Sequence, residues 1–94
     1  MYIHLGNDCS IRRSNIIAVL DMDNATLSKN TREFFRIAEE EGFIESISND
    51  IPKSAVICEI DNKSKIYLSP VASSTIRKRI AEGLKADVKF RIDY

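Results

Sequence analysis

The chain has 94 residues and a formal net charge of +0, with 14 basic and 14 acidic side chains. This length fits a single small domain, its 44% hydrophobic content argues against disorder, and its neutral balance argues against a strongly basic nucleic-acid-binding domain. No apolar run approaches the roughly 20 residues of a membrane span, and the start lacks the pattern of a secretion signal. The two cysteines, Cys9 and Cys58, have no metal-binding spacing, so we expect free thiols in a cytoplasmic protein without membrane association.

The N-terminal part of the chain predicts three strands. Residues 2–5 alternate between polar and apolar, residues 6–8 carry a Gly-Asn-Asp turn signal, and residues 9–12 form a second short strand. The apolar, β-branched run at residues 16–20 predicts a strand that is covered on both faces, either by the fold or by a neighbouring subunit.

A helix is expected after a polar connection, starting near Ser28 or Asn30. Asn30 and Glu33 have the spacing of a capping box, and Gly42 fits a left-handed stop. The acidic residues 39–41 lie in the last turn, where the helix dipole disfavours negative charge, which suggests a basic partner nearby. The apolar stripe expected to face the core comprises Phe34, Ile37 and Ala38, flanked by Phe35.

The second half of the chain predicts a hairpin and a second helix. Strands are expected at residues 43–47, 55–60 and 65–68, with residues 61–63 as the turn between the last two. A helix capped by Ser73 or Ser74 should follow and stop at Gly83. Its apolar stripe, at i, i+4 and i+8, comprises Ile76, Ile80 and Leu84.

The tail at residues 88–94 alternates between apolar and charged residues, which predicts a half-buried strand that pairs within the chain or with another subunit. Together these elements predict a small α+β domain with a mostly antiparallel β-sheet and two helices. We expect this domain to span residues 1–84 and residues 85–94 to form a C-terminal strand-like extension.

A series of short motifs runs from the N-terminus to about Arg79 in a distinctive order and spacing. These motifs are Tyr2-Ile3-His4-Leu5-Gly6, Pro52-Lys53-Ser54-Ala55-Val56, Ile66-Tyr67-Leu68-Ser69-Pro70, Ser73-Ser74-Thr75 and Lys78-Arg79. Together they resemble the extracellular matrix regulatory protein family, most closely its RemB branch.

The resemblance implies a bacterial cytoplasmic protein with a curved, LytTR-like sheet, so that residues 1–84 form a RemB-like domain. The sister RemA branch is a DNA-binding transcription regulator of biofilm matrix genes, and it assembles into closed rings around which DNA wraps. RemA places arginines before two of its strands; the corresponding positions here are Asn15 and residues 51–53, of which only Lys53 is positively charged. The resemblance therefore supports the implied fold and ring for this chain more strongly than the implied DNA contact.

Six basic residues are candidate contacts to the DNA backbone, because lysine and arginine supply the salt-sensitive, sequence-independent part of DNA affinity. Adjacent residues on a strand point to opposite faces, so at most one of the first two should face any given surface. The other four form one basic patch if the loop and the second helix are neighbours; the alternatives are a solvated helix face or salt bridges to residues 39–41 of an adjacent subunit. The six are Arg12, Arg13, Lys53, Arg77, Lys78 and Arg79.

Catalytic chemistry finds little support in the sequence. His4 is the only histidine, and no partner marks a triad around it, so we interpret it as structural. The acidic residues 39–41 cannot all face one metal ion from a helix, and no glycine-rich phosphate loop occurs. We therefore expect no catalytic residues, metal or cofactor, and a protein that is not an enzyme.

The expected function is that of a DNA-associated bacterial regulatory protein, which binds the backbone of duplex DNA as a ring-shaped homo-oligomer. Charge is divided along the chain: residues 33–61 are mainly acidic and residues from 63 onward mainly basic, which suits packing between subunits or a basic face for phosphates. The neutral total and the missing arginines keep an alternative open. This is a structural or protein-interaction module that self-assembles, or co-assembles with a RemA-type partner, without binding DNA.

Overall fold

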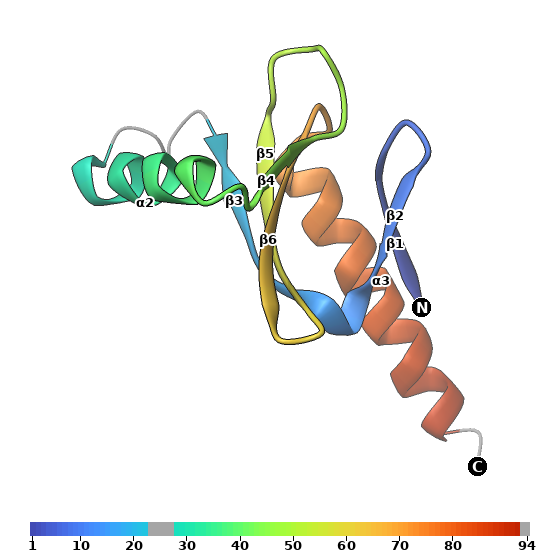
Figure 1. Cartoon of the computed structure of the whole chain (residues 1–94). Helices are drawn as coiled ribbons and strands as arrows, with labels where there is room; N and C mark the ends of the chain where they lie inside the picture. The colour runs from blue at the N-terminus through green and yellow to red at the C-terminus, as the bar shows by residue number, and fades with distance from the viewer. Residues whose placement is uncertain (23–27, 93–94) are drawn as a thin grey trace.

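The chain folds as an α+β domain, as the sequence predicts (Figure 1). The computed structural model describes residues 1–22 and 28–92, with side chains described as far as residue 83. In chain order the elements are β1 (Tyr2–Gly6), β2 (Cys9–Arg12), the short 3₁₀ helix η1 (Arg13–Asn15), β3 (Ile16–Asp21), α2 (Lys29–Glu40), β4 (Ile44–Ser46), β5 (Ser54–Ile60), β6 (Lys63–Ser69) and α3 (Ser73–Ile92).

A four-stranded sheet in the order β3-β5-β6-β4 forms the centre of the molecule. β3, β5 and β6 are antiparallel, and the short β4 lies parallel to β6 at the edge. The predicted hairpin is confirmed: β5 and β6 pair from Ser54↔Ser69 at one end to Ile60↔Lys63 at the other. Asp61 and Asn62 connect them with φ values of 51° and 65°, the left-handed backbone that a two-residue hairpin turn requires.

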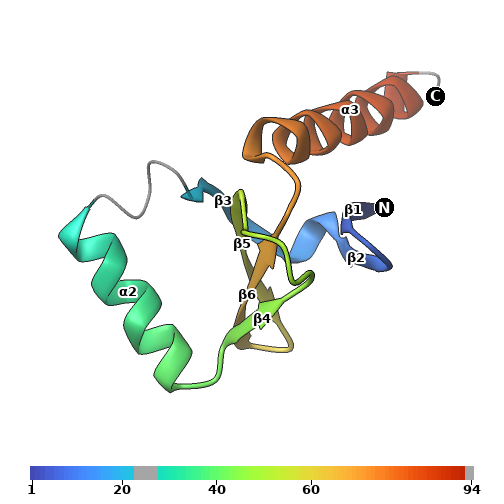
Figure 2. The ribbon, with the colours of Figure 1, turned by 90° about the horizontal axis from the view of Figure 1, so that it is seen from above.

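The first face of the sheet is covered by α3 and by the hairpin of β1 and β2 (Figure 2). β1 alternates as predicted, since Ile3 and Leu5 are buried while Tyr2 and His4 are exposed. Ile76 of α3 is fully buried in the same cluster. The turn after β1 needs Gly6: its φ is +121°, and a Cβ there would lie 3.3 Å from the ring of Pro70.

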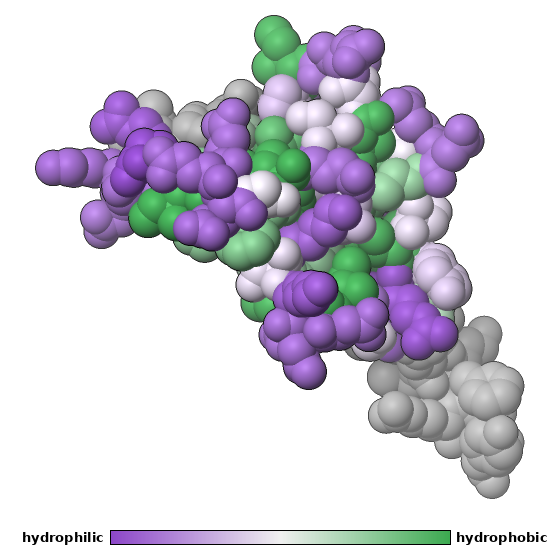
Figure 3. All heavy atoms as spheres, in the orientation of Figure 1, coloured by the Kyte–Doolittle hydropathy of each residue, from purple (hydrophilic) through white to green (hydrophobic). Residues whose placement is uncertain are grey.

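The second face of the sheet is covered by α2, and only in part. Ala38 packs with Ala55 and Ile66, and Phe35 contacts this small cluster. The predicted stripe is partly wrong, because Phe34 and Ile37 remain 44% and 47% exposed. The helix contributes a narrower face than its sequence pattern suggests, and Figure 3 shows hydrophobic atoms reaching the surface between α2 and the sheet.

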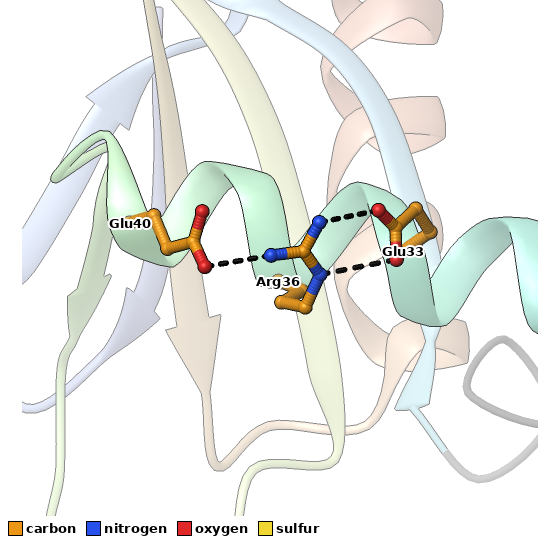
Figure 4. A network of polar contacts seen from close by, with 3 residues as sticks. All are labelled: Glu33, Arg36 and Glu40. Atoms are coloured by element: carbon orange, nitrogen blue, oxygen red, sulfur yellow. Dashed lines mark hydrogen bonds and ion pairs between the residues drawn. The ribbon is translucent and has the colours of Figure 1, made fainter.

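The N-terminus of α2 corrects a second detail. Ser28 caps the helix by accepting a hydrogen bond from the backbone N–H of Thr31, so Asn30 lies inside the first turn and does not form the predicted capping box with Glu33. Gly42 has the predicted left-handed conformation, with φ +77°. Of the acidic residues 39–41, Glu40 has a basic partner within the helix itself, because Arg36 contacts Glu40 as well as Glu33 one turn earlier (Figure 4).

The C-terminal strand predicted at residues 88–94 is wrong over residues 88–92, because α3 continues without a break to Ile92. Residues 93–94 lie outside the described residues, and the division of the chain at residue 84 stays a prediction. Gly83 does not stop the helix. A Cβ there would lie 2.1 Å from the sulfur of Met1, so this glycine admits the N-terminus against the helix. No proline follows Gly83, and Leu, Lys and Ala favour continued helix.

Candidate nucleic-acid interface

The three basic residues of α3 point in different directions. Successive residues of an α-helix are separated by about 100° around its axis. Ile76 and Ile80 face the core, so Arg77 and Arg79 flank the buried stripe on opposite sides, and Lys78 points away from the domain. The helix therefore distributes these charges around its circumference, and each meets different surroundings.

Arg77 lies over β3, the strand at one edge of the sheet. Its Nη2 donates a hydrogen bond of 2.9 Å to the carbonyl oxygen of Val19. This bond ties α3 to the edge strand. A charged side chain over a sheet edge also hinders another strand from pairing there.

Arg79 lies on the other side of α3, over β1. Its Nη1 donates a 2.8 Å hydrogen bond to the carbonyl oxygen of His4. His4 in turn places Nε2 within 2.7 Å of the carbonyl oxygen of Asn7, which holds it in the β1–β2 turn region. The histidine therefore has the structural surroundings that its isolation in the sequence suggests.

A shallow groove of about 320 Å³ runs between β1 and α3, and we call it the hairpin–helix groove. It is lined by residues 1–4 on one side and by Arg79, Glu82 and Gly83 on the other. Glu82 is the acidic residue in this lining. Because Arg79 uses one of its five N–H donors on His4, the guanidinium keeps others for a ligand in the groove.

Arg12 and Arg13 do not line this groove themselves, but each contacts residues that do. The Nε of Arg12 lies 3.5 Å from the hydroxyl of Tyr2, its cross-strand neighbour, and this contact raises the pKa of the already cationic guanidinium. The backbone N–H of Arg13 donates to the carbonyl of Met1, and its Cδ approaches Gly83, 3.8 Å from where a Cβ would be. The strand-alternation argument for these two arginines does not apply, because Arg13 begins η1 and leaves the strand; whether both face one surface stays a prediction.

Lys53 lies apart from the groove, directly before the first residue of β5. Its backbone is held on both sides, donating to Ser69 and accepting from Met22, while its side chain is exposed. The neighbouring Ser54 hydroxyl donates to the carbonyl of Val71, so this loop and the start of α3 are adjacent, as the basic-patch hypothesis requires. The four residues nevertheless diverge, since Arg77 and Arg79 bind different strands.

The structure thus places Arg12, Arg13 and Arg79 in contact with residues 1–4 at the N-terminus, and leaves Lys53, Arg77 and Lys78 elsewhere. Sequence reasoning missed the part that Tyr2 plays beside Arg12. The signal was present in the sequence, because two short strands joined by a tight turn place residue 2 opposite residue 12.

Metal binding, membrane insertion and thiol reactivity are three further possibilities for the part of the chain that the structure describes. No group of three or more potential metal ligands occurs in it, and no helix there is long and apolar enough to cross a membrane. Both cysteines are free. Burial raises the pKa of the Cys58 thiol to about 11 and raises that of Cys9, so neither thiol is activated as a nucleophile.

Comparison with known proteins gives concordant results. Residues 2–80 match the family model of RemA-like proteins, described as extracellular matrix regulatory protein A-like. Over 93 residues, which cover 99% of each chain, the sequence is 34% identical to extracellular matrix regulatory protein B of Bacillus subtilis (strain 168). The chain therefore belongs to the RemA-like family of extracellular matrix regulatory proteins.

Proposed function

We propose that this protein is a DNA-associated regulator without catalytic activity, which assembles as a ring-shaped homo-oligomer and contacts the backbone of duplex DNA through the hairpin–helix groove. One observation carries this proposal: Arg79 lines a groove whose lining contains one acidic residue, Glu82, and Arg12 and Arg13 each contact a residue of the same lining, Tyr2 and Met1 respectively. Guanidinium groups provide forked donors that match phosphate oxygens.

Assembly is needed for such a contact to be effective. The chain has a net charge of +0, so a single subunit gains little from long-range attraction to DNA. A ring repeats the groove once per subunit, and linked sites bind with an avidity far above that of one site. The proposed ring and the proposed DNA contact therefore depend on each other physically.

Duplex DNA binding measured at two salt concentrations tests this function. We expect affinity to fall steeply as salt rises, because each phosphate contact releases counterions. Arg12→Ala should weaken binding and lower the salt slope by about one per contact removed. Arg32→Ala is the matched control, since Arg32 is an exposed arginine on α2, on the far side of the sheet. Equal effects of the two variants, or no binding at low salt, would contradict the groove.

A specific observation favours a second candidate, an assembling module that does not bind DNA. Arg77 and Arg79 both donate to backbone carbonyls, and so stabilise the domain whether or not DNA is bound. Such a module would self-assemble or co-assemble with a RemA-type partner. It predicts a solution mass that rises with protein concentration, or on mixing with that partner, and that does not change when duplex DNA is added.

A further inference from the structure

The loop between β4 and β5 presents an unusual side chain. Ile51 is 87% exposed, more than any other large apolar residue that the structure describes. The loop that carries it is held in place: the N–H of Asp50 donates to the hydroxyl of Ser48, and the N–H of Lys53 donates to Ser69. Pro52 further restricts the backbone. The exposed side chain of Ile51 is therefore carried by a loop whose backbone is held in place. The exposed Asp50 precedes it directly in the sequence.

A recess of about 660 Å³ lies beside the β5–β6 turn, and we call it the turn recess. Phe43, Ile60 and Tyr67 give it an apolar part, and Lys63 and Lys65 contribute positive charge against Asp61. Lys65 is occupied within the chain, because its Nζ lies 3.7 Å from Glu45 and 5.4 Å from the centre of the Tyr67 ring. Lys63 is exposed at the rim, which gives the recess a cationic group for an incoming acidic residue.

The β4–β5 loop and the β5–β6 turn lie at opposite ends of the sheet (Figure 1), and the recess is lined by residues of that turn. The loop precedes Ser54, whose partner on β6 is Ser69, whereas the recess surrounds the end where Ile60 pairs with Lys63. One chain cannot therefore satisfy its own recess. Two different surfaces at opposite ends of a subunit make a head-to-tail contact, which closes into a ring or continues as a filament.

We propose that Ile51 of one copy of this chain occupies the turn recess of the next copy, with Asp50 facing Lys63. The contact rests on the self-assembly in the proposed function and assigns it two surfaces. Docking removes the Ile51 side chain and the apolar part of the turn recess from water together. The opposite charges of Asp50 and Lys63 fix the orientation of the two copies and disfavour other docking arrangements.

Solution mass as a function of concentration tests the contact. Ile51→Ser should raise the concentration needed for assembly at least tenfold, and unchanged circular dichroism and melting temperature would show that the fold is retained. Ile37→Ser is the matched control: Ile37 is also an exposed apolar side chain, but on α2, and its replacement should leave assembly unchanged. Normal assembly of Ile51→Ser, or loss of assembly only in Ile37→Ser, overturns the contact.

A charge exchange tests the orientation. Asp50→Lys and Lys63→Glu should each weaken assembly, and the double variant should recover most of it because the pair is then reversed. A head-to-tail contact also makes a specific mixing prediction: at a concentration where Ile51→Ser and Lys63→Glu subunits are each monomeric alone, a mixture of the two should form dimers. In that dimer an intact loop of one variant meets an intact recess of the other.

The outcomes distinguish a failure of the proposed contact from a failure of the proposed self-assembly. If the mixture stays monomeric and the double charge variant is no better than the single ones, the proposed surfaces are wrong while self-assembly stands. If the unaltered chain is itself monomeric at micromolar concentration, the proposed self-assembly fails and the contact fails with it.

Discussion

The two faces of the central sheet differ in how many side chains they bury. Among the described residues, seven buried side chains join the cluster under α3 and the β1–β2 hairpin, whereas three join the cluster under α2. The first face draws its residues from β1, β2, β5, β6 and α3, so its burial depends on contacts far apart in the sequence. The comparison indicates that stability resides on the first face, and that α2 is a more weakly attached element.

The largest expected effect is a difference between matched isoleucine truncations. Ile76→Ala removes a fully buried side chain and should cost about 2–5 kcal/mol of unfolding free energy. Ile37→Ala, at a position that is 47% exposed, should cost less than about 1 kcal/mol. Urea unfolding monitored by circular dichroism measures both, and similar costs would contradict the difference between the faces.

Thiol chemistry gives the next effect. Cys58 lies in the first-face cluster with no exposed surface and a pKa of about 11, so at neutral pH its thiolate fraction should be about a hundredfold below that of a thiol with the ordinary value. In native protein, a maleimide should modify the half-buried Cys9 first and reach Cys58 only when the domain unfolds. Mass spectrometry of time points distinguishes the two sites. Early labelling of Cys58 would show that the first face opens readily.

Capping gives a smaller effect on the second face. Ser28→Ala removes the acceptor for the N–H of Thr31 and should lower stability by about 1 kcal/mol. Because α2 is weakly attached, hydrogen exchange should quicken mainly in α2, leaving β5 and β6 protected. Asn30→Ala, two residues further along the chain and inside the first turn, is the control and should change little. A uniform increase in exchange across the sheet would show that α2 unfolds with the whole domain.

The smallest effect is a pH dependence of α2. Arg36 donates hydrogen bonds to the carboxylate of Glu33 (Figure 4), and this hydrogen bonding lowers the pKa of Glu33. A carboxylate whose folded-state pKa is depressed stabilises the fold above its unfolded pKa, and this stabilisation is lost as the pH falls through the folded value. Arg36→Gln should therefore flatten the acid-side loss of helix below the ordinary glutamate range. All three groups are exposed, so added salt should weaken the effect.

The resemblance to the family predicted the membership correctly, and the local pattern predicted most elements of the fold. The β1 alternation, the β5–β6 turn and the left-handed Gly42 are short-range features that a few neighbouring residues specify. The errors arose where a pattern permits two structures. Alternation at residues 88–92 indicated a strand, but a helix already under way from Ser73 continues unless a residue stops it.

The sequence predicted which types of residue form the candidate site, but it predicted only part of their arrangement in space. The sequence by itself determined that basic residues follow β1 and occupy α3, because composition and helical pattern are local properties. Only the tertiary structure decided that Arg79 meets β1 while Arg77 meets β3, and that Arg12 and Arg13 contact residues that line the groove beside Arg79. The reason is geometric: a helix rotates neighbouring side chains by about 100°, so which strand each one meets depends on how the helix docks.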